Sequence, residues 1–253
     1  MPATSPDLRL GLLGPLRLTL DGSVTPVPAP KHRAVLAVLA VNMGRAVTAE
    51  RIIEELWQGA APAFARKTLQ GYVWRIRRLV GDHLLTHGGG YELRAGTGET
   101  DAARFEGLVA DGREAPRDRD HARARGRLAL ALRLWRGPAL ADVPAGPVIF
   151  AYAERLEETR LLAPEAAAEP DIALGRAAEA VPLLRELTIT HPLRESAHAL
   201  LMLSLYRCGR QSEALAVYGA LRETLVREQG LQPGRAVADL HHRILQADPG
   251  LDV

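Results

Sequence analysis

Cationic and amide side chains recur on one side of the segment from residue 63 to residue 80, and their types favour binding to a polyanion. Plotted at 100° per residue, they gather on one face of a helix that carries almost no acid. Guanidinium groups can donate two hydrogen bonds to a guanine edge, while an ammonium group neutralises phosphate charge. The face consists of Lys67, Gly71, Trp74 and Arg78, flanked by Gln70 and Arg75, with Arg66 and Arg77 at its borders.

The opposite face of the same segment is apolar. Leu69, Val73, Ile76 and Val80 fall within one narrow sector, which is the pattern of a helix packed on a core. The segment is therefore predicted to be an amphipathic helix whose basic face can meet nucleic acid. The alternative is a basic face that only meets solvent, as most charged helix surfaces do.

The elements around this helix must position it. Residues 8–20 place leucines at alternate positions on both sides of a glycine-containing turn, and a second such turn follows, so three short antiparallel strands are expected. Helical spacing runs from Lys31 to Gly44, and Thr48 is a good N-cap for a second short helix. Residues 84–93 predict a hairpin around a glycine turn. Together these elements describe a winged helix-turn-helix, whose third helix can enter a major groove.

Beyond residue 95 the chain is predicted to be helical almost throughout. Residues 174–181 align with residues 208–215 at an offset of 34, the tetratricopeptide period, in which each unit is a pair of helices. Small Ala180 and Ala214 would let neighbouring helices pack closely. Such arrays offer a concave surface to partners, although the repeat can also stack only on itself and on the first domain. The helices are expected near residues 102–114, 121–135, 150–162, 177–190, 193–208, 211–229 and 235–246.

Composition excludes several classes of protein. The chain has 253 residues, 47% of them hydrophobic, which suffices for one large or two ordinary domains and excludes disorder over the whole length. The single Cys208 excludes an internal disulfide. The longest apolar run is eight residues, against the roughly 20 needed to span a bilayer, and the first twenty residues lack a signal-peptide core. We expect a soluble, cytoplasmic protein without membrane contact.

Charge and motifs favour binding over catalysis. The net charge is only +2, but residues 28–94 hold ten basic and five acidic side chains, while residues 95–253 hold twenty and twenty-three. The glycine run at 88–90 lacks the continuation of a phosphate loop. His241 and His242 would point about 100° apart on a helix, a poor geometry for a shared metal. Since no hydrolase or zinc-protease motif occurs either, we expect no enzyme activity, no cofactor and no metal site.

Several segments strongly resemble the Streptomyces antibiotic regulatory protein family, in the same order and over nearly the whole chain. The resemblance implies a mainly α-helical protein. Residues 1–95 would form a winged helix-turn-helix of the response-regulator effector type, with a small N-terminal β-sheet and a C-terminal hairpin, and residues 96–253 an all-α, tetratricopeptide-like bacterial transcriptional activator domain. The matching segments are residues 13–16, 30–36, 65–73 and 75–79 in the first part, and 134–140 and 197–233 in the second.

For function, the resemblance implies a pathway-specific activator that binds direct repeats upstream of secondary-metabolite biosynthetic genes and helps recruit RNA polymerase. Expected partners are double-stranded promoter DNA, RNA polymerase through its sigma and other subunits, and a second protomer on tandem repeats. Residues 57–63 correspond to a loop that can touch polymerase in such winged helices. The alternatives are a helical interaction scaffold with a degenerate winged helix, and a regulator whose helical concavity binds a small ligand.

The resemblance also assigns contacts. Lys31 and Arg33 match phosphate contacts at the start of the first helix, where the helix dipole adds to the attraction. His87 at the hairpin turn is the expected contact of the wing with an adjacent groove or phosphate. Trp74 stands where the family usually has a small polar residue, so its indole is expected either to stack on sugar or a thymine methyl group or to bury at a protein contact. The expected base or phosphate contacts of the third helix are Arg66, Lys67, Gln70, Arg75, Arg77 and Arg78.

Two prolines depart from the repeat pattern. Pro164 and Pro170 lie inside residues 161–174, the expected first helix of the repeat. Each proline removes a backbone donor and clashes with the preceding turn, at a cost of about 3 kcal/mol in a helix interior. We therefore expect this helix to be kinked or broken. His32, in place of a usual glutamine, is a minor departure.

Overall fold

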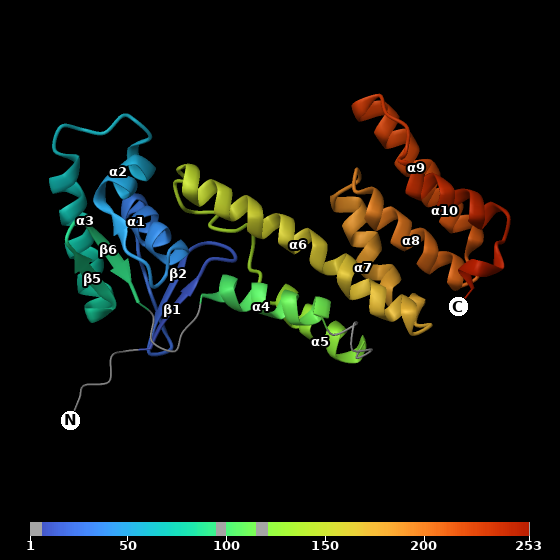
Figure 1. Ribbon diagram of the computed structural model, residues 1–253, viewed down its shortest axis with the longest axis horizontal. Helices are drawn as coiled ribbons and strands as arrows, with labels where there is room; N and C mark the ends of the chain where they lie inside the picture. The colour runs from blue at the N-terminus through green and yellow to red at the C-terminus, as the bar shows by residue number, and fades with distance from the viewer. Residues whose placement is uncertain (1–6, 95–99, 115–120, 253) are drawn as a thin grey trace. The chain divides into compact units, whose positions relative to one another are not determined.

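The computed structural model describes most of the chain, and Figure 1 shows its helices and strands. The described residues are 7–94, 100–114 and 121–252. The chain forms two compact units, one made of residues 1–107 and 133–159, the other of residues 108–132 and 160–253. Residues 133–159 thus belong to the first unit, although they lie beyond the expected domain boundary at residue 95. The assignment of domains to residues 1–95 and 96–253 stays a prediction.

The expected antiparallel sheet at the start of the chain is confirmed. Strands β1 (Leu8–Gly11), β2 (Arg17–Leu20) and β3 (Ser23–Thr25) pair in that order. In the register, Leu10 lies opposite Leu18, and both side chains are buried. The alternation of leucine with polar residues therefore directs one face of this sheet into the core.

A second small sheet follows the helices in sequence. It contains β4 (Val47–Thr48), β5 (Leu84–His87) and β6 (Gly90–Leu93) in the order β4-β6-β5, with antiparallel pairs. The hairpin of β5 and β6 is the predicted wing. Strand β4 was not expected, because two residues carry too little alternation to be recognised in a sequence.

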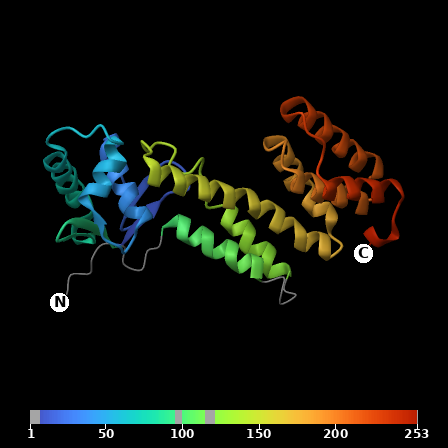
Figure 2. The same cartoon turned by 45° about the horizontal axis from the view of Figure 1, so that its top comes forward.

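Three helices fill the space between these sheets. They are α1 (Pro30–Val41), α2 (Ala49–Trp57) and α3 (Ala65–Val80), and a short 3₁₀ turn at Gly81–His83 leads into the wing. Residues 34–40 of α1 are all buried, so this helix is enclosed on every side. Both views draw it between α3 and the first sheet (Figures 1 and 2). As predicted, Thr48 caps α2, its hydroxyl accepting a hydrogen bond from the N–H of Arg51 at 3.3 Å.

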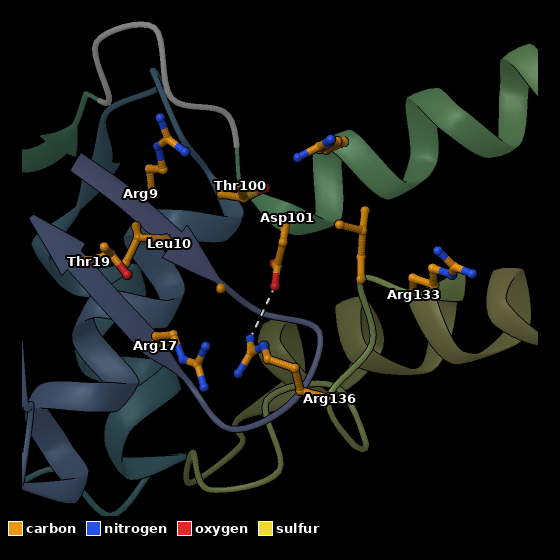
Figure 3. A pocket seen from close by; sticks show the side chains of 11 residues that line it. Arg9, Leu10, Arg17, Thr19, Thr100, Asp101, Arg133 and Arg136 are labelled. Atoms are coloured by element: carbon orange, nitrogen blue, oxygen red, sulfur yellow. Dashed lines mark hydrogen bonds and ion pairs between the residues drawn. The ribbon is translucent and has the colours of Figure 1, made fainter. Parts of the chain in front are cut away.

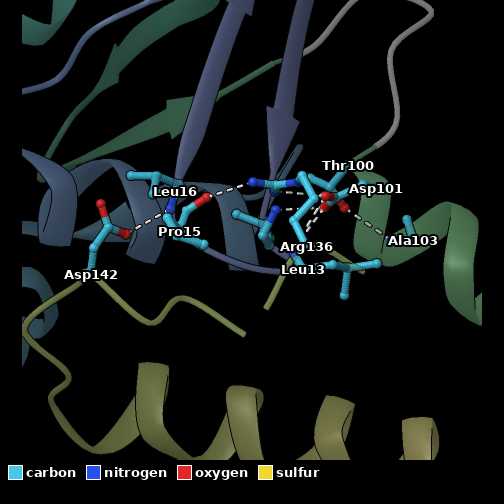
Figure 4. A network of polar contacts seen from close by, with 9 residues as sticks. Leu13, Pro15, Leu16, Thr100, Asp101, Ala103, Arg136 and Asp142 are labelled. Atoms are coloured by element: carbon cyan, nitrogen blue, oxygen red, sulfur yellow. Dashed lines mark hydrogen bonds and ion pairs between the residues drawn. The ribbon is translucent and has the colours of Figure 1, made fainter. Parts of the chain in front are cut away.

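A polar network fastens the loop between β1 and β2 to later parts of the first unit (Figure 4). Asp101, at the start of α4 (Asp101–Glu114), accepts hydrogen bonds from the N–H groups of Leu12 and Leu13. The guanidinium of Arg136 donates to Asp101 at 3.1 Å and to the carbonyl of Pro15 at 2.9 Å. Residues 136–142 therefore run alongside this loop and complete the first unit.

A buried carboxylate makes a second link within the same unit. Glu55 on α2 is only 3% exposed, and its two oxygens accept the N–H groups of Val148 and Ile149 at 2.9 and 2.8 Å. These N–H groups belong to the first turn of α6 (Pro147–Ala173), where the helix dipole also favours a negative charge. A side chain at Gly146 would collide with this carboxylate, so the close approach requires glycine. Glu55 thus caps a helix that begins about 90 residues later in the sequence.

The second unit contains the predicted repeat. Its helices include α5 (His121–Leu132), α7 (Ala177–Thr190), α8 (Glu195–Arg207), α9 (Gln211–Gln229) and α10 (Arg235–Leu245), and a 3₁₀ turn covers Pro249–Leu251. The turns before α7 and α9 match, since Gly175 and Gly209 have φ values of 72° and 73°. Ala180 and Ala214, the small residues of the two copies, are both buried in the core of this unit as predicted.

We expected a kink or a break at Pro164 and Pro170; the break is wrong, and the kink stays a prediction. Helix α6 continues through both prolines from Pro147 to Ala173. Both prolines are buried, as are Ala163 and Ala168 beside them. Packing along this stretch outweighs the backbone hydrogen bonds that the two prolines cannot make. The expected helices at residues 150–162 and 161–174 are thus one helix.

None of the helices in the described parts of the chain is long and apolar enough to cross a membrane.

The cap on α6 gives a first prediction. Replacing Glu55 with alanine leaves two buried N–H groups without their acceptor, and we expect the free energy of unfolding to fall by about 2–3 kcal/mol. Urea denaturation followed by circular dichroism measures the change. Glu54 is the matched control, because it is the exposed neighbour on the same helix, and Glu54→Ala should change stability by less than about 0.5 kcal/mol. Equal midpoints for the two variants would show that the cap contributes nothing.

Candidate nucleic-acid interface

Helix α3 is oriented as its periodicity predicts. Leu69, Val73, Ile76 and Val80 are all buried, together with Ala65. Because these residues hold α3 against α1 and α2, its opposite face is left to solvent.

The solvent face of α3 carries the predicted set of polar and basic side chains. Helix α3 has no acidic residue, so no charge within the helix offsets these cations. Arg66 makes an ion pair with Glu50 of α2, and both side chains are well exposed. Such a pair contributes little in water and is easily exchanged for a phosphate. The exposed residues are Arg66, Lys67, Gln70, Gly71, Trp74, Arg75 and Arg78.

Trp74 and Arg78 form a pair on this face. Trp74 is 56% exposed, and the guanidinium carbon of Arg78 lies 5.2 Å from the centre of its ring. A guanidinium stacked on an aromatic face keeps the N–H groups at its edge available for donation. The indole of Trp74 therefore supports the guanidinium of Arg78 from one side.

Arg77 has internal partners. Its Nε–H donates to the carbonyl of Leu84 at 3.2 Å and its Nη2 to the hydroxyl of Thr86 at 2.6 Å. Both acceptors lie on β5, so Arg77 ties the wing to α3. A role of Arg77 in contacting DNA stays a prediction.

The wing presents His87 beside a carboxylate. Nε2 of His87 lies 2.6 Å from Oε2 of Glu92 across the hairpin. Hydrogen bonds from Arg94 and then from His87 lower the pKa of Glu92, against the opposing effect of its burial. Glu92 thus remains ionised and holds the imidazole at the base of the wing turn. Contact of His87 with nucleic acid stays a prediction.

The two cations at the start of α1 are also used inside the first unit. Lys31 donates to the carbonyl of Leu56 and lies 5.6 Å from the ring centre of Trp57. Arg33 donates to the carbonyls of Val27 and Pro28 at 3.1 and 2.7 Å, and it makes an ion pair with Asp142 at 3.4 Å. These contacts favour a structural role for both residues, and their phosphate contacts stay predictions.

An aromatic cluster behind α3 was not predicted from the sequence. Tyr72 of α3 meets the edge of His32 at 5.1 Å and stacks with Trp57 at 6.4 Å between ring centres. Burial, and then the charge of Arg75, lowers the pKa of His32, so this histidine stays neutral near pH 7. The cluster joins α1, α2 and α3 at one point. The only sequence signal for this cluster is that Tyr72 and Trp57 are aromatic, because residues on two different helices form no local pattern.

Comparison with known proteins matches both parts of the chain. Residues 27–93 match the family described as the C-terminal part of transcriptional regulatory proteins, and residues 100–245 match the bacterial transcriptional activator domain. The regulatory protein DnrI of Streptomyces peucetius is 41% identical over 258 residues, which cover 97% of this chain and 94% of DnrI. This chain belongs to the Streptomyces antibiotic regulatory protein family.

Two further relatives have longer chains. The regulatory protein AfsR of Streptomyces griseus is 40% identical over 99% of this chain, but the match covers only 26% of AfsR. A solved structure of Mycobacterium tuberculosis EmbR, in complex with a low-affinity phosphopeptide, has a TM-score of 0.91 and 36% identity over 96% of this chain and 66% of that one. The chain thus spans about a quarter of AfsR and about two thirds of the EmbR structure.

The family identifies this protein as a transcriptional regulator of the antibiotic regulatory type, and its relatives are regulators, not enzymes. The winged helix-turn-helix followed by a helical domain is confirmed by the structure and by the EmbR match. Among the residues that the structure describes, no three His, Cys, Asp or Glu side chains are placed to hold a metal ion.

The partners of Arg77 give a second prediction. Replacing Arg77 with alanine removes two hydrogen bonds between α3 and the wing, and we expect a loss of about 1–2 kcal/mol in the free energy of unfolding. Thr86→Val, which removes one acceptor, should cost less. Arg75→Ala serves as the control, since this exposed neighbour on α3 should change stability by less than about 0.5 kcal/mol. If Arg75→Ala destabilised as much as Arg77→Ala in a urea titration, Arg77 would have no special structural role.

Proposed function

We propose that this regulator is a sequence-specific DNA-binding activator of a secondary-metabolite gene cluster, which inserts α3 into the major groove at direct repeats of a promoter. The observation that carries the proposal is the solvent face of α3, which gathers basic and amide side chains and no acid. Membership of the family and the near full-length match to DnrI support it.

The dimensions of α3 suit a groove. Lys67 and Arg78 are eleven residues apart, or about 16 Å along a helix at 1.5 Å per residue. This length corresponds to about five base pairs at 3.4 Å each. The contacts of one protomer would thus cover one copy of the repeated sequence, and a second protomer would bind the next copy.

Affinity for DNA and the choice of base sequence would come from different residues on the solvent face of α3. Lys67 and Arg66, in the first turn, are suited to neutralising phosphate charge, which supplies affinity and salt dependence. Arg75, Arg78 and Gln70 carry the forked or amide groups that read base edges. The indole of Trp74, already stacked with Arg78, would keep that guanidinium in place while meeting sugar or a thymine methyl group.

Activation requires a contact with RNA polymerase, for which the segment between α2 and α3 is the candidate. Residues 58–64 are all exposed, and Phe64 is 75% exposed. An aromatic side chain displayed beside the DNA-reading helix suits a protein contact close to the promoter. The second unit supplies further helical surface for sigma or other subunits.

The proposal is tested by enriching bound duplexes from a random pool and measuring the affinity of the selected sequence across a salt series. We expect a repeated motif at a fixed helical spacing and an affinity that falls steeply with salt. Weak binding that ignores sequence would contradict the proposal and favour an interaction scaffold in which Trp74 faces a protein.

Individual side chains of α3 give a third prediction. Arg78→Ala and Lys67→Ala should each weaken binding of the selected duplex and reduce the salt slope by about one, because each removes one cation from the face. Arg78→Ala should also relax the choice of base at one position, whereas Lys67→Ala should weaken all sequences alike. The melting temperature should hardly change, since both side chains point away from the core.

The matched control for these variants is Arg235→Ala, which removes an exposed arginine on α10 and should leave DNA binding unchanged. If Lys67→Ala and Arg78→Ala both bound the duplex as tightly as the parent at moderate salt, α3 would not be the reading helix.

A further inference from the structure

A cavity of about 480 Å³ opens in the first unit between the first sheet, the start of α4 and the segment at residues 133–136 (Figure 3). Arg9 and Arg17 border it from adjacent strands, and the ion pair of Asp101 with Arg136 lies on its border. Its volume falls within the range of small-molecule sites.

The lining of this cavity is strongly cationic. Among the residues that the structure describes, five arginines border it, against the one carboxylate of Asp101. That carboxylate is already occupied, because it accepts hydrogen bonds from the N–H groups of Leu12 and Leu13 and from Arg136. The five arginines are Arg9, Arg17, Arg104, Arg133 and Arg136.

The arginines of the cavity differ in how far they are engaged. Arg136 is held by Asp101 and the carbonyl of Pro15, and Arg9 makes an ion pair with Asp7 at 2.9 Å. The remaining three are exposed, and within the described residues their guanidinium groups have no hydrogen-bond or ion-pair partner. These three are Arg17, Arg104 and Arg133.

Unpaired guanidinium groups around one space repel each other, and a bound anion removes that repulsion. Guanidinium binds phosphate with two parallel hydrogen bonds, so several arginines around one cavity suit a ligand with more than one phosphate group. The hydroxyl groups of Thr19 and Thr100 also line the cavity and are further polar groups for phosphate oxygens.

We propose that this cavity is a binding site for a small ligand that carries two or more linked phosphate groups. A small ligand fits better than a DNA backbone, because the site is a cavity and not an extended face. The site also lies apart from α3, since both views draw α1 between α3 and the first sheet, which forms one wall (Figures 1 and 2). The proposal does not depend on the DNA-binding role of α3.

Isothermal titration calorimetry on the full chain, in a buffer without phosphate or sulfate, tests the proposal. The probes are inorganic tripolyphosphate, ATP and, as the uncharged comparison, adenosine. We expect tripolyphosphate and ATP to bind with one site per chain and adenosine not to bind. Equal affinities would show that the phosphate chain alone is recognised, and tighter binding of ATP would show that the nucleoside also contacts the cavity.

The decisive variant is Arg17→Ala combined with Arg104→Ala, which we expect to weaken tripolyphosphate binding at least tenfold. Both side chains are exposed, and an unchanged melting temperature confirms that the variant is folded. Arg133→Ala alone should weaken binding by a smaller factor. Arg45→Ala is the matched control, because it removes an exposed arginine of the same unit outside the cavity and should leave binding unchanged.

Two results would overturn the proposal. If tripolyphosphate bound the Arg17→Ala, Arg104→Ala variant as tightly as the parent, the cavity would not be its site. If Lys67→Ala with Arg78→Ala abolished tripolyphosphate binding instead, the anion would occupy the solvent face of α3, and the cavity arginines would have no ligand of this class.

Discussion

The buried carboxylate of Glu55 at the first turn of α6 is the interaction on which the arrangement of the first unit depends. A charge withdrawn from water must be met by strong donors, and here the donors are helix N–H groups from more than 90 residues away. Because α2 directly precedes α3, the position of the basic face is coupled to a segment that belongs by sequence to the transcriptional activator domain. Asp101 and Arg136 likewise hold the β1–β2 loop by hydrogen bonds from later parts of the sequence. The first unit is therefore a winged helix completed by residues 133–159.

This construction divides the cations of the first unit into two groups. Lys31, Arg33 and Arg77 donate to carbonyl or hydroxyl oxygens of the same unit, so their side chains are held in place and their hydrogen-bonding capacity is partly used. Within the described part of the chain, Lys67, Arg75 and Arg78 make no such hydrogen bond, and Arg66 has only its exposed ion pair with Glu50. A count of positive charge along residues 28–94 does not distinguish these two groups. The structure does, because the first group makes hydrogen bonds within the unit and the second faces solvent.

The sequence predicted the features that repeat at short range. A 3.6-residue period predicted which face of α3 is buried, and alternating leucines predicted the first sheet. The 34-residue offset predicted the matching turns at Gly175 and Gly209. Features that depend on distant partners were not predictable. Glu55 looks like one more acid on an amphipathic helix until α6 is placed against it. Pro164 and Pro170 suggest a break because local propensity is unfavourable there, but burial of that stretch of α6 overrides it.

The two cationic surfaces of the first unit differ in shape and in origin, and this difference decides what each can bind. The basic residues of α3 come from one continuous helix and project outward, so they suit a long, regular polyanion that a helix can follow. The arginines of the cavity come from β1, β2, α4 and the segment near residue 136, and they surround a space of limited volume. A duplex cannot enter such a space, but a compact anion can be contacted from several sides at once. Since Asp101 and Arg136 border the cavity and also fasten the β1–β2 loop, an anion bound there would act on the same network that completes the winged helix.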